Sequence, residues 1–557
     1  MPTAPTLVLQ NLISGSRLNK FFSPDQVDQA PKQTQSLRQQ SAWLLVAKVI
    51  GFSLSFVLPL IIVRYLTQES VGHYRESFQV ITNAVVILSL GVSMSSYYYL
   101  ARETSRRASA VLNILIFNFV MGGAACLFLN LYPHFLGNIF QTDELTKLAP
   151  KIGLVVWIWM LSTFIETVAL ANREVRMATA FIVISQLSKT LLMAGAVLVF
   201  GSVEAFLYAA MIQGMIQIFV LLTYVRSRFP KVWRSFDLGF FREQLAYALP
   251  YGFAGVLWIA QTDIHNYFVG YKFSDADFAI YAYGCFEVPL IAMLTESVTS
   301  VLIPKMNALH MAGDREEMIR LTARATHKLS FFYFPLYAFL LITASTFITT
   351  LFTDRYAASV PIFLINITLL PFAVLINDPV IRSYKEMGRM FLIARILILT
   401  SLVTVLYFGL SSFGMTGMIT TAVAAIVVER VTAQVMVINK LQIGLRHMYL
   451  LVPVAKTAVA SAVAGLVTYL VYSNFNMSIA NAARQFAGSQ LAITKATTLH
   501  FIGGAAVMAI SAAVFLPIYL VAANLLGLID DEEKESIKKM FRRVIPSRVS
   551  TVSEVAN

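Results

Sequence analysis

The sequence predicts an all-α, polytopic membrane protein with about fourteen transmembrane helices, and three observations support this fold class. Of the 557 residues, 57% are hydrophobic and only 13% are charged, about half the charged share of a soluble protein. The mean hydropathy is +0.69. Apolar runs of about 20 residues recur along the chain, the length that a helix needs to cross about 30 Å of hydrocarbon.

Short connections separate the expected helices, and no soluble domain is inserted between them. The polar residues 1–38 lack the order of a cleavable signal, so the first span is expected to direct membrane insertion. The predicted spans are 39–64, 77–100, 110–132, 150–172, 178–200, 203–225, 243–268, 280–304, 328–352, 358–383, 390–411, 415–440, 448–473 and 498–527.

The basic residues predict the orientation of these spans. With the amino terminus inside, the amino-terminal tail and the inner loops together carry 24 Lys and Arg, and the outer loops carry eight. This asymmetry follows the positive-inside rule and predicts that both termini lie on the cytoplasmic side of the membrane. It also accounts for the net charge of +13 through anionic membrane lipids, without a nucleic-acid partner. The carboxyl-terminal tail, 529–557, is expected to be a membrane-surface helix or a partner-binding segment.

An internal repeat divides the predicted helices into two groups of six. Tyr65 and Tyr74 flank the first outer loop, as Tyr271 and Tyr281 flank the loop after the seventh helix. An even number of helices separates the copies, so they have the same orientation, which predicts two bundles around a central cavity. The predicted divisions are 39–236 (helices 1–6), 237–443 (helices 7–12) and 444–528 (the two extra helices 13 and 14).

Ionisable residues lie inside several spans, where each costs about 2.5 to 3.5 kcal/mol on insertion scales. The first is Lys48, followed by Gly51 and Ser55 on the same side of the helix. Small and polar neighbours favour a cavity-facing lysine, and snorkelling to the inner headgroups is the alternative. The full set is Lys48, Glu166, Lys189, Asp263, Glu287, Glu296, Asp378, Arg395, Glu429, Arg430 and Lys456.

The other cations differ in their sequence surroundings. Lys189 is flanked by two serines and a glutamine, which favours a cavity. Arg395 lies close enough to the inner end of its helix that a cavity and the headgroups are equally compatible. Arg430 adjoins Glu429, but neighbouring positions point about 100° apart, so each is expected to have a partner elsewhere, structural or ligand. Lys456 is expected to snorkel.

Four acids are candidates for polar contacts with a substrate or for ion coupling: Asp263, Glu287, Glu296 and Asp378. Buried carboxylates can pair with the cations, bind sugar hydroxyls, or carry a coupling proton or sodium ion. A structural salt bridge is the default interpretation for each of them.

The motifs of several protein classes are missing from the sequence. It has no P-loop for nucleotide hydrolysis and no H-E-x-x-H metal motif, and its loops are too short for a catalytic domain. Cys126 and Cys285 both fall in apolar segments, which supports neither a disulfide nor a cysteine-based metal site. We therefore expect a non-enzymatic protein without cofactors or resident metals.

The sequence resembles the Wzx-type polysaccharide flippases of the multidrug/oligosaccharidyl-lipid/polysaccharide exporter superfamily. The stretch "LLVAKVIGFSLSFVLPLIIVRYLTQESVGHYR" looks like their opening helix and first outer loop. "YALPYGFAGVLWIAQTDIHNYFVG" with "IYAYG", "AGDREEMIRLTARATHK" and "FGMTGMITTAVAAIVVERV" are similar to their later helices and loops. These motifs are degenerate patterns spread over residues 39–527.

The resemblance implies transport of an undecaprenyl-diphosphate-linked oligosaccharide from the cytoplasmic to the periplasmic leaflet of the bacterial inner membrane, for surface polysaccharide synthesis and by alternating access. A polysaccharide polymerase or export machinery would be a natural partner. A diphosphate headgroup gives the cations Lys48, Lys189, Arg395 and Arg430 a purpose, since burying it unpaired would be prohibitive. The alternatives are a lipid II flippase, which also has fourteen spans, an ion-driven drug exporter on the same scaffold, and a non-transporting membrane scaffold.

Overall fold

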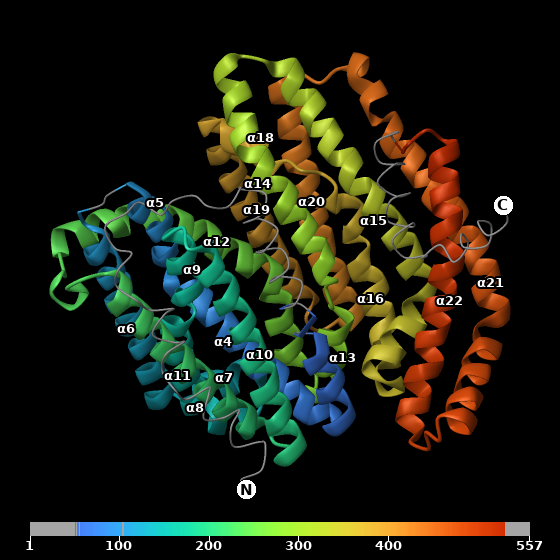
Figure 1. The fold of residues 1–557 in the computed structure, drawn as a ribbon, viewed down its shortest axis with the longest axis horizontal. Helices are drawn as coiled ribbons and strands as arrows, with labels where there is room; N and C mark the ends of the chain where they lie inside the picture. Colours follow the sequence, from blue (N-terminus) through green and yellow to red (C-terminus); the bar gives the residue numbers. More distant parts are fainter. Residues whose placement is uncertain (1–50, 52, 55, 103–104, 530–557) are drawn as a thin grey trace, which may run out of the picture. The chain divides into compact units, whose positions relative to one another are not determined.

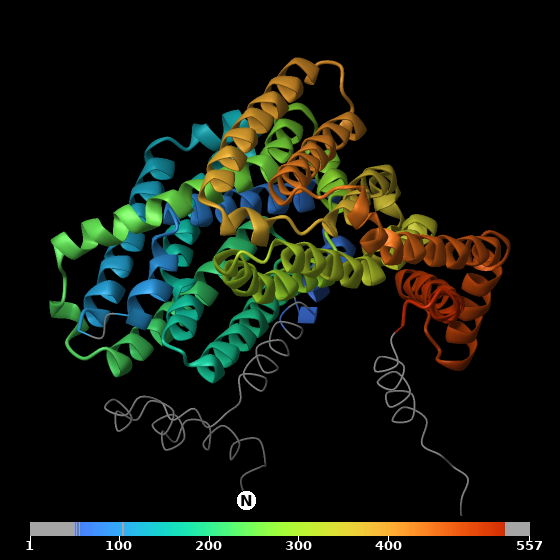
Figure 2. The same cartoon turned by 90° about the horizontal axis from the view of Figure 1, so that it is seen from above.

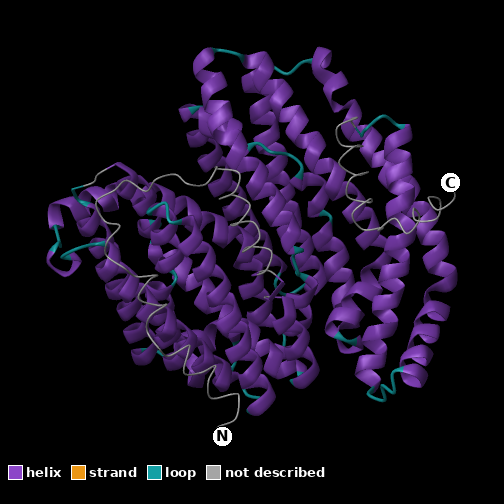
Figure 3. Ribbon diagram, in the orientation of Figure 1, coloured by secondary structure: helices purple, strands orange, loops and turns teal. Residues whose placement is uncertain are grey.

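The structure is a computed structural model that describes the chain except residues 1–50, 52, 55, 103–104 and 530–557. Every regular element in this described part is a helix (Figures 1 and 3). The predicted all-α class is therefore confirmed. The predicted amino-terminal tail lies outside the described residues, and so does Lys48.

Ten described helical segments are long and apolar enough to cross a membrane, which confirms a multi-pass membrane protein. The helices Gln68–Ser89 and Val92–Leu100 meet at a 57° bend and make an eleventh span if the two are counted as one. Of the predicted first span, the apolar helix Phe56–Tyr65 is described. The helices at the predicted spans 243–268 and 280–304 are not among the ten.

The chain packs as two compact units, each described here by itself. The first unit contains residues 1–283 and 395–422. Its described elements are α4 (Gln68–Ser89), η2 (Val92–Met94), α5 (Ser95–Arg102), α6 (Arg107–Leu131), α7 (His134–Phe140), α8 (Asp143–Ser162), α9 (Phe164–Ala171), α10 (Val175–Val199), α11 (Val203–Arg228), η3 (Val232–Arg234), α12 (Leu238–Lys272) and α13 (Asp275–Gly284).

The second unit contains residues 284–394 and 423–557. Its elements are α14 (Pro289–Ala312), α15 (Arg315–Phe352), η4 (Asp354–Ser359), α16 (Val360–Ile367), α17 (Leu369–Ala373), α18 (Asp378–Ser383), η5 (Leu445–Leu451), α21 (Val452–Gln490) and α22 (Ala496–Leu525). Two further helices, α19 (Lys385–Gly409) and α20 (Met415–Leu441), are each divided between the units. By packing, α12 and most of α13 group with the first unit; the predicted repeat division at residue 237 stays a prediction.

Side-chain caps fix the starts of the helices that position the site. Thr67 Oγ1 accepts the Ser70 N–H at 3.2 Å where α4 begins. Asp237 Oδ1 accepts the Phe240 N–H at 3.0 Å at the start of α12. Each cap satisfies a backbone donor that has no intrahelical partner, worth about 1 kcal/mol.

A buried polar contact ties three helices of the first unit together. The Asn113 amide on α6 donates to Gln244 Oε1 on α12 at 2.9 Å. Gln244 Nε2 in turn donates to Ser95 Oγ on α5 at 3.3 Å. Buried amides need such partners, so this contact fixes the register of α12 against its neighbours.

The helices α15, α21 and α22 pack side by side within the second unit (Figures 1 and 2). Their shared core contains Ala460, Ala464, Phe515 and Tyr519. Small residues on α21 permit this close approach. The predicted interruption after residue 473 is wrong, because α21 continues as one helix to Gln490.

Two other predicted spans are interrupted in the structure. The span 280–304 breaks at residues 285–288, between α13 and α14, just before Pro289. The span 358–383 breaks after α17, and Asp378 begins the separate short helix α18. Proline disfavours helical geometry in the residue before it, which explains the break before Pro289.

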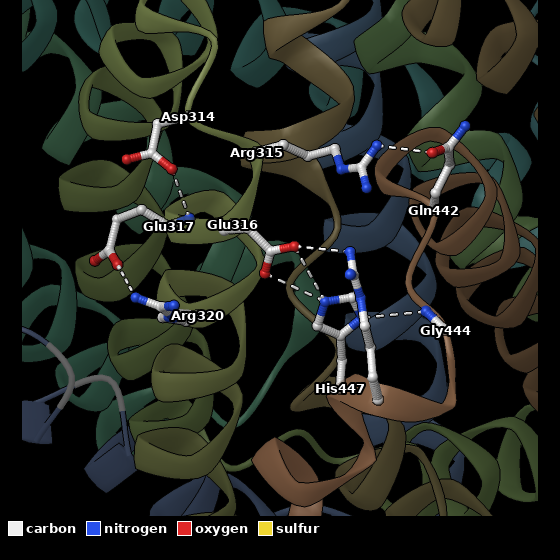
Figure 4. A network of polar contacts seen from close by, with 9 residues as sticks. Asp314, Arg315, Glu316, Glu317, Arg320, Gln442, Gly444 and His447 are labelled. Carbon is white, nitrogen blue, oxygen red and sulfur yellow. Dashed lines mark hydrogen bonds and ion pairs between the residues drawn. The ribbon is translucent and has the colours of Figure 1, made fainter.

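A polar network in the second unit joins the start of α15 to η5 (Figure 4). Arg315 Nη1 donates to Gln442 Oε1 at 2.8 Å, and Glu316 contacts His447 Nε2 at 3.3 Å. His447 Nδ1 accepts the Gly444 N–H at 3.1 Å, so the ring proton is on Nε2 and faces Glu316. The network holds together two loops that are predicted to lie on the cytoplasmic side.

We expect Gly252→Ala to destabilise the first unit, because α4 ends against this glycine. A Cβ at Gly252 would lie 2.1 Å from the Leu90 carbonyl oxygen, and the neighbouring Gly91 has a positive φ of 68°. Overpacking of this kind costs about 1 to 3 kcal/mol. Thermal unfolding of the purified protein measures it. Gly255→Ala is the matched control, because no atom lies within 4 Å of its added Cβ; equal melting temperatures for the two variants would contradict this packing.

Candidate functional site

The described residues after Lys48 pack against α10, the helix that carries Lys189. The added Cβ position at Gly51 lies 3.3 Å from Gln186 Cγ, and Thr190 Oγ1 donates to the Leu54 carbonyl at 3.3 Å. Both contacts come from the polar turn around Lys189 that the sequence singled out. The first span and α10 therefore share a face rich in small and polar groups.

Lys189 lies on the face of a buried tryptophan. Its Nζ is 4.7 Å from the centre of a Trp159 ring on α8. Trp159 is 7% exposed, and its indole N–H donates to the Ala210 carbonyl at 3.1 Å, which fixes the ring orientation. A cation over a desolvated indole gains about 2 kcal/mol, less than a direct contact with an anion can give. The Trp159 ring thus holds the Lys189 ammonium in place, and a bound anion could take over this contact.

Asp263 lies in an amide-rich contact between α12 and α4. Its Oδ2 accepts Gln79 Nε2 at 2.9 Å, and Asn83 also bonds to this carboxylate. Asn83 Nδ2 in turn donates to the Tyr267 hydroxyl at 3.2 Å. Neutral amide donors thus bind the Asp263 carboxylate. Sugar hydroxyls or a cation could bind it in their place.

Gln261, two positions before Asp263 on α12, has unused hydrogen-bonding capacity. It is fully buried, and neither atom of its amide has a hydrogen-bond partner among the described residues. Buried amides are nearly always paired, so this group is expected to meet a ligand or ordered water.

Arg395 on α19 also lies over an indole, with Cζ 5.3 Å from the centre of a Trp258 ring on α12. Trp258 is 41% exposed, so this contact is wetter and weaker than that of Lys189. Helix α19 is further joined to α12 through the loop that follows it, where Lys272 Nζ donates to the Phe413 carbonyl at 2.9 Å.

Arg430 lies in the second unit with a different set of partners. It is close enough to Glu429, Tyr333 and Glu287 to interact electrostatically. The Tyr333 hydroxyl contacts Thr295 Oγ1 at 2.6 Å, and the Arg430 carbonyl accepts Asn377 Nδ2 at 3.2 Å. These contacts favour the structural interpretation of Arg430 over ligand binding.

The remaining predicted acids are more exposed. Glu287 lies in the nonhelical segment before α14, and Glu296 lies on an exposed position of α14. Asp378 is 46% exposed and accepts Arg382 Nε at 2.7 Å one turn later. Such a surface pair contributes about 0 to 1 kcal/mol.

The structure therefore groups the predicted residues by unit. Lys189, Asp263 and Arg395 belong to the first unit, each with its own aromatic or amide partner. Sequence reasoning missed Gln79, Asn83 and the two tryptophans. The spacing of Gln79 and Asn83, one helical turn apart in an apolar helix, is the signal that would have found the first pair.

Comparison with known proteins gives a partial match to a family model and a shared fold. A family model described as "Polysaccharide biosynthesis protein" matches residues 84–361. A search of curated protein sequences finds no significant match.

Solved structures show the fold. The structure of the lipid II flippase MurJ, inward closed, is similar with a TM-score of 0.63 and 14% identity, covering 87% of this chain and 98% of that one. An inward-facing multidrug resistance MATE transporter has a TM-score of 0.55 and 17% identity, covering 71% and 98%. A transporter of the same superfamily from Pyrococcus furiosus has a TM-score of 0.52 and 17% identity, covering 74% and 96%.

The family match and the shared fold agree with the resemblance seen in the sequence to the Wzx-type flippases of the multidrug/oligosaccharidyl-lipid/polysaccharide exporter superfamily.

Proposed function

We propose that the protein is a flippase that moves an undecaprenyl-diphosphate-linked oligosaccharide from the cytoplasmic to the periplasmic leaflet of the inner membrane. The observation that carries this proposal is the match to a polysaccharide biosynthesis family in a chain that folds like a lipid-linked precursor flippase. Both termini would lie in the cytoplasm, as the basic inner loops predict.

The cations of the first unit support an anionic substrate. A diphosphate linkage carries about two negative charges, and it is costly to desolvate without partners. Lys189 supplies a point charge and Arg395 a planar fork, both resting on indole rings that a phosphate can displace. Lys48 would add a third charge and stays a prediction. Like-charge repulsion by these residues disfavours the cationic ligands of many drug exporters.

The amide-rich contact at Asp263 supports a second role. Gln79 and Asn83 bring amide groups to this carboxylate that can also bond to sugar hydroxyls. Alternatively, Asp263 binds the coupling proton or sodium ion, and its release drives the return to the inward-facing state. Alternating access is the mechanism we propose, in which ligands act through their differential affinity for the two states.

Deletion of the gene tests the function. We expect fully assembled, lipid-linked repeat units to accumulate on the cytoplasmic leaflet and surface polysaccharide to be lost, with both restored by the intact protein. Accumulation of peptidoglycan precursor would instead identify a lipid II flippase. Unchanged lipid-linked glycans together with drug sensitivity would identify a small-molecule exporter.

A further inference from the structure

Three acids and a histidine gather where the start of α4 meets the start of α13. Glu69, His73 and Glu76 lie on one face of α4, since they are four and three positions apart. Asp275 is the first residue of α13, and a Cβ on Gly72 would lie 2.0 Å from its carbonyl oxygen. The absence of a side chain at Gly72 thus brings Asp275 against the acidic face of α4.

The distances within this cluster are longer than hydrogen bonds and approach those between ligands of one ion. His73 Nδ1 is 3.5 Å from Asp275 Oδ1 and 3.8 Å from Glu76 Oε2. One ligand atom each from Glu69, His73 and Asp275 lie within 4.8 Å of one another. These separations exceed a normal N–H···O hydrogen bond of about 2.7 to 3.2 Å. They approach the spacing of about 3.4 Å between two ligands that are each about 2.0 to 2.1 Å from a tetrahedral zinc ion.

The burial of Glu76 points to an ion independently of these distances. It is 1% exposed, and its Oε2 has no hydrogen-bond partner among the described residues, nor has His73 Nδ1. The adjacent Arg75 lies over the Tyr283 ring, 4.4 Å from its centre. A buried carboxylate aimed at a histidine nitrogen without a close bond is what an ion between them would explain.

We propose that Glu69, His73, Glu76 and Asp275 form a binding site for a divalent transition-metal ion, with Zn²⁺ as the best match. Imidazole nitrogen together with carboxylate oxygen suits zinc, whereas calcium and magnesium favour oxygen ligands alone. The exposed Glu69 gives the ion a route from solvent. A bound ion would join the start of α4 to the start of α13, independently of the proposed substrate.

Zinc titration of the full-length purified protein tests this site, with zinc chloride as the probe and calorimetry as the readout. We expect one zinc per chain and at least a tenfold loss of affinity in His73→Ala and in Glu76→Gln, which keeps the side-chain shape. Zinc should also raise the melting temperature of the unmodified protein but not of these variants. Cobalt absorption in the visible range reports the coordination geometry without any assay of transport.

His134→Ala is the matched control, since it removes an exposed histidine at the start of α7 in the same unit. It should bind zinc as the unmodified protein does. The proposal is wrong if the unmodified protein binds zinc no more tightly than Glu76→Gln, or if His134→Ala loses as much affinity as His73→Ala.

Discussion

Lys189→Ala should nearly abolish the production of surface polysaccharide. Lys189 is the predicted cation with the most enclosed partner, and Trp159 holds it in a fixed place. A hydrogen bond to a charged group contributes about 1.5 to 3 kcal/mol, so we expect transport to fall about 10- to 100-fold. The measurement is complementation of the deletion strain at matched protein levels, with quantified surface glycan and lipid-linked precursor.

The matched control for this variant is Lys147→Ala. Lys147 forms an exposed ion pair with Glu144 on α8, the helix that carries Trp159. Such pairs contribute little, so this variant should complement fully. Lys189→Arg keeps the positive charge and should retain part of the activity. Normal glycan levels with Lys189→Ala would remove Lys189 from the substrate path.

Asp263→Asn should uncouple transport from its driving ion. Asparagine preserves the size of the side chain and much of its contact with Gln79 and Asn83, but removes the charge. We expect at least a tenfold loss of gradient-driven accumulation in proteoliposomes, with lipid exchange at zero gradient retained. The coupling ion can drive transport only if it binds the two states of the protein with different affinity. Without the carboxylate, this position no longer binds the ion.

Asp378→Asn is the control for Asp263→Asn, because it makes the same chemical change at an exposed ion pair with Arg382. It should leave gradient-driven transport within about twofold of the unmodified protein, as expected for a surface pair. Equal losses in both variants, or none in Asp263→Asn, would show that Asp263 has no coupling role.

The helical class and the spans were predictable because hydrocarbon imposes a simple length rule on apolar runs. The interruptions were harder to predict. Pro289 indicates the break before α14. No residue pattern predicts that α21 continues to Gln490. There the polar letters of "NFNMSIANAARQ" suggested a loop, while helix propensity and packing against α22 produce a helix.

The sequence predicts the charged residues of the candidate site but not the uncharged residues that contact them. Lys189 and Asp263 stand out because charges are rare inside spans. Their partners are apolar or neutral residues from distant segments: Trp159 lies 30 residues before Lys189, and Gln79 lies 184 residues before Asp263. Such pairings depend on tertiary packing, which a single sequence does not report.

The proposed zinc ligands illustrate the same difficulty. Three of them lie within eight residues on α4, but without the histidine pair that marks the H-E-x-x-H motif. The fourth, Asp275, comes from the start of α13, about 200 residues later. Only the contact of Gly72 with the start of α13 brings them together.

Reconstitution into proteoliposomes tests the central claim most directly. The purified protein is inserted into vesicles that contain undecaprenyl-diphosphate-linked oligosaccharide, and a membrane-impermeant enzyme that cleaves the glycan is added outside. Without flipping, about half of a symmetrically distributed lipid is accessible to the enzyme. We predict that the unmodified protein makes nearly all of it accessible, whereas Lys189→Ala vesicles stay near half. The account would be contradicted if about half of the lipid-linked oligosaccharide stays inaccessible with the unmodified protein while the same protein flips lipid II.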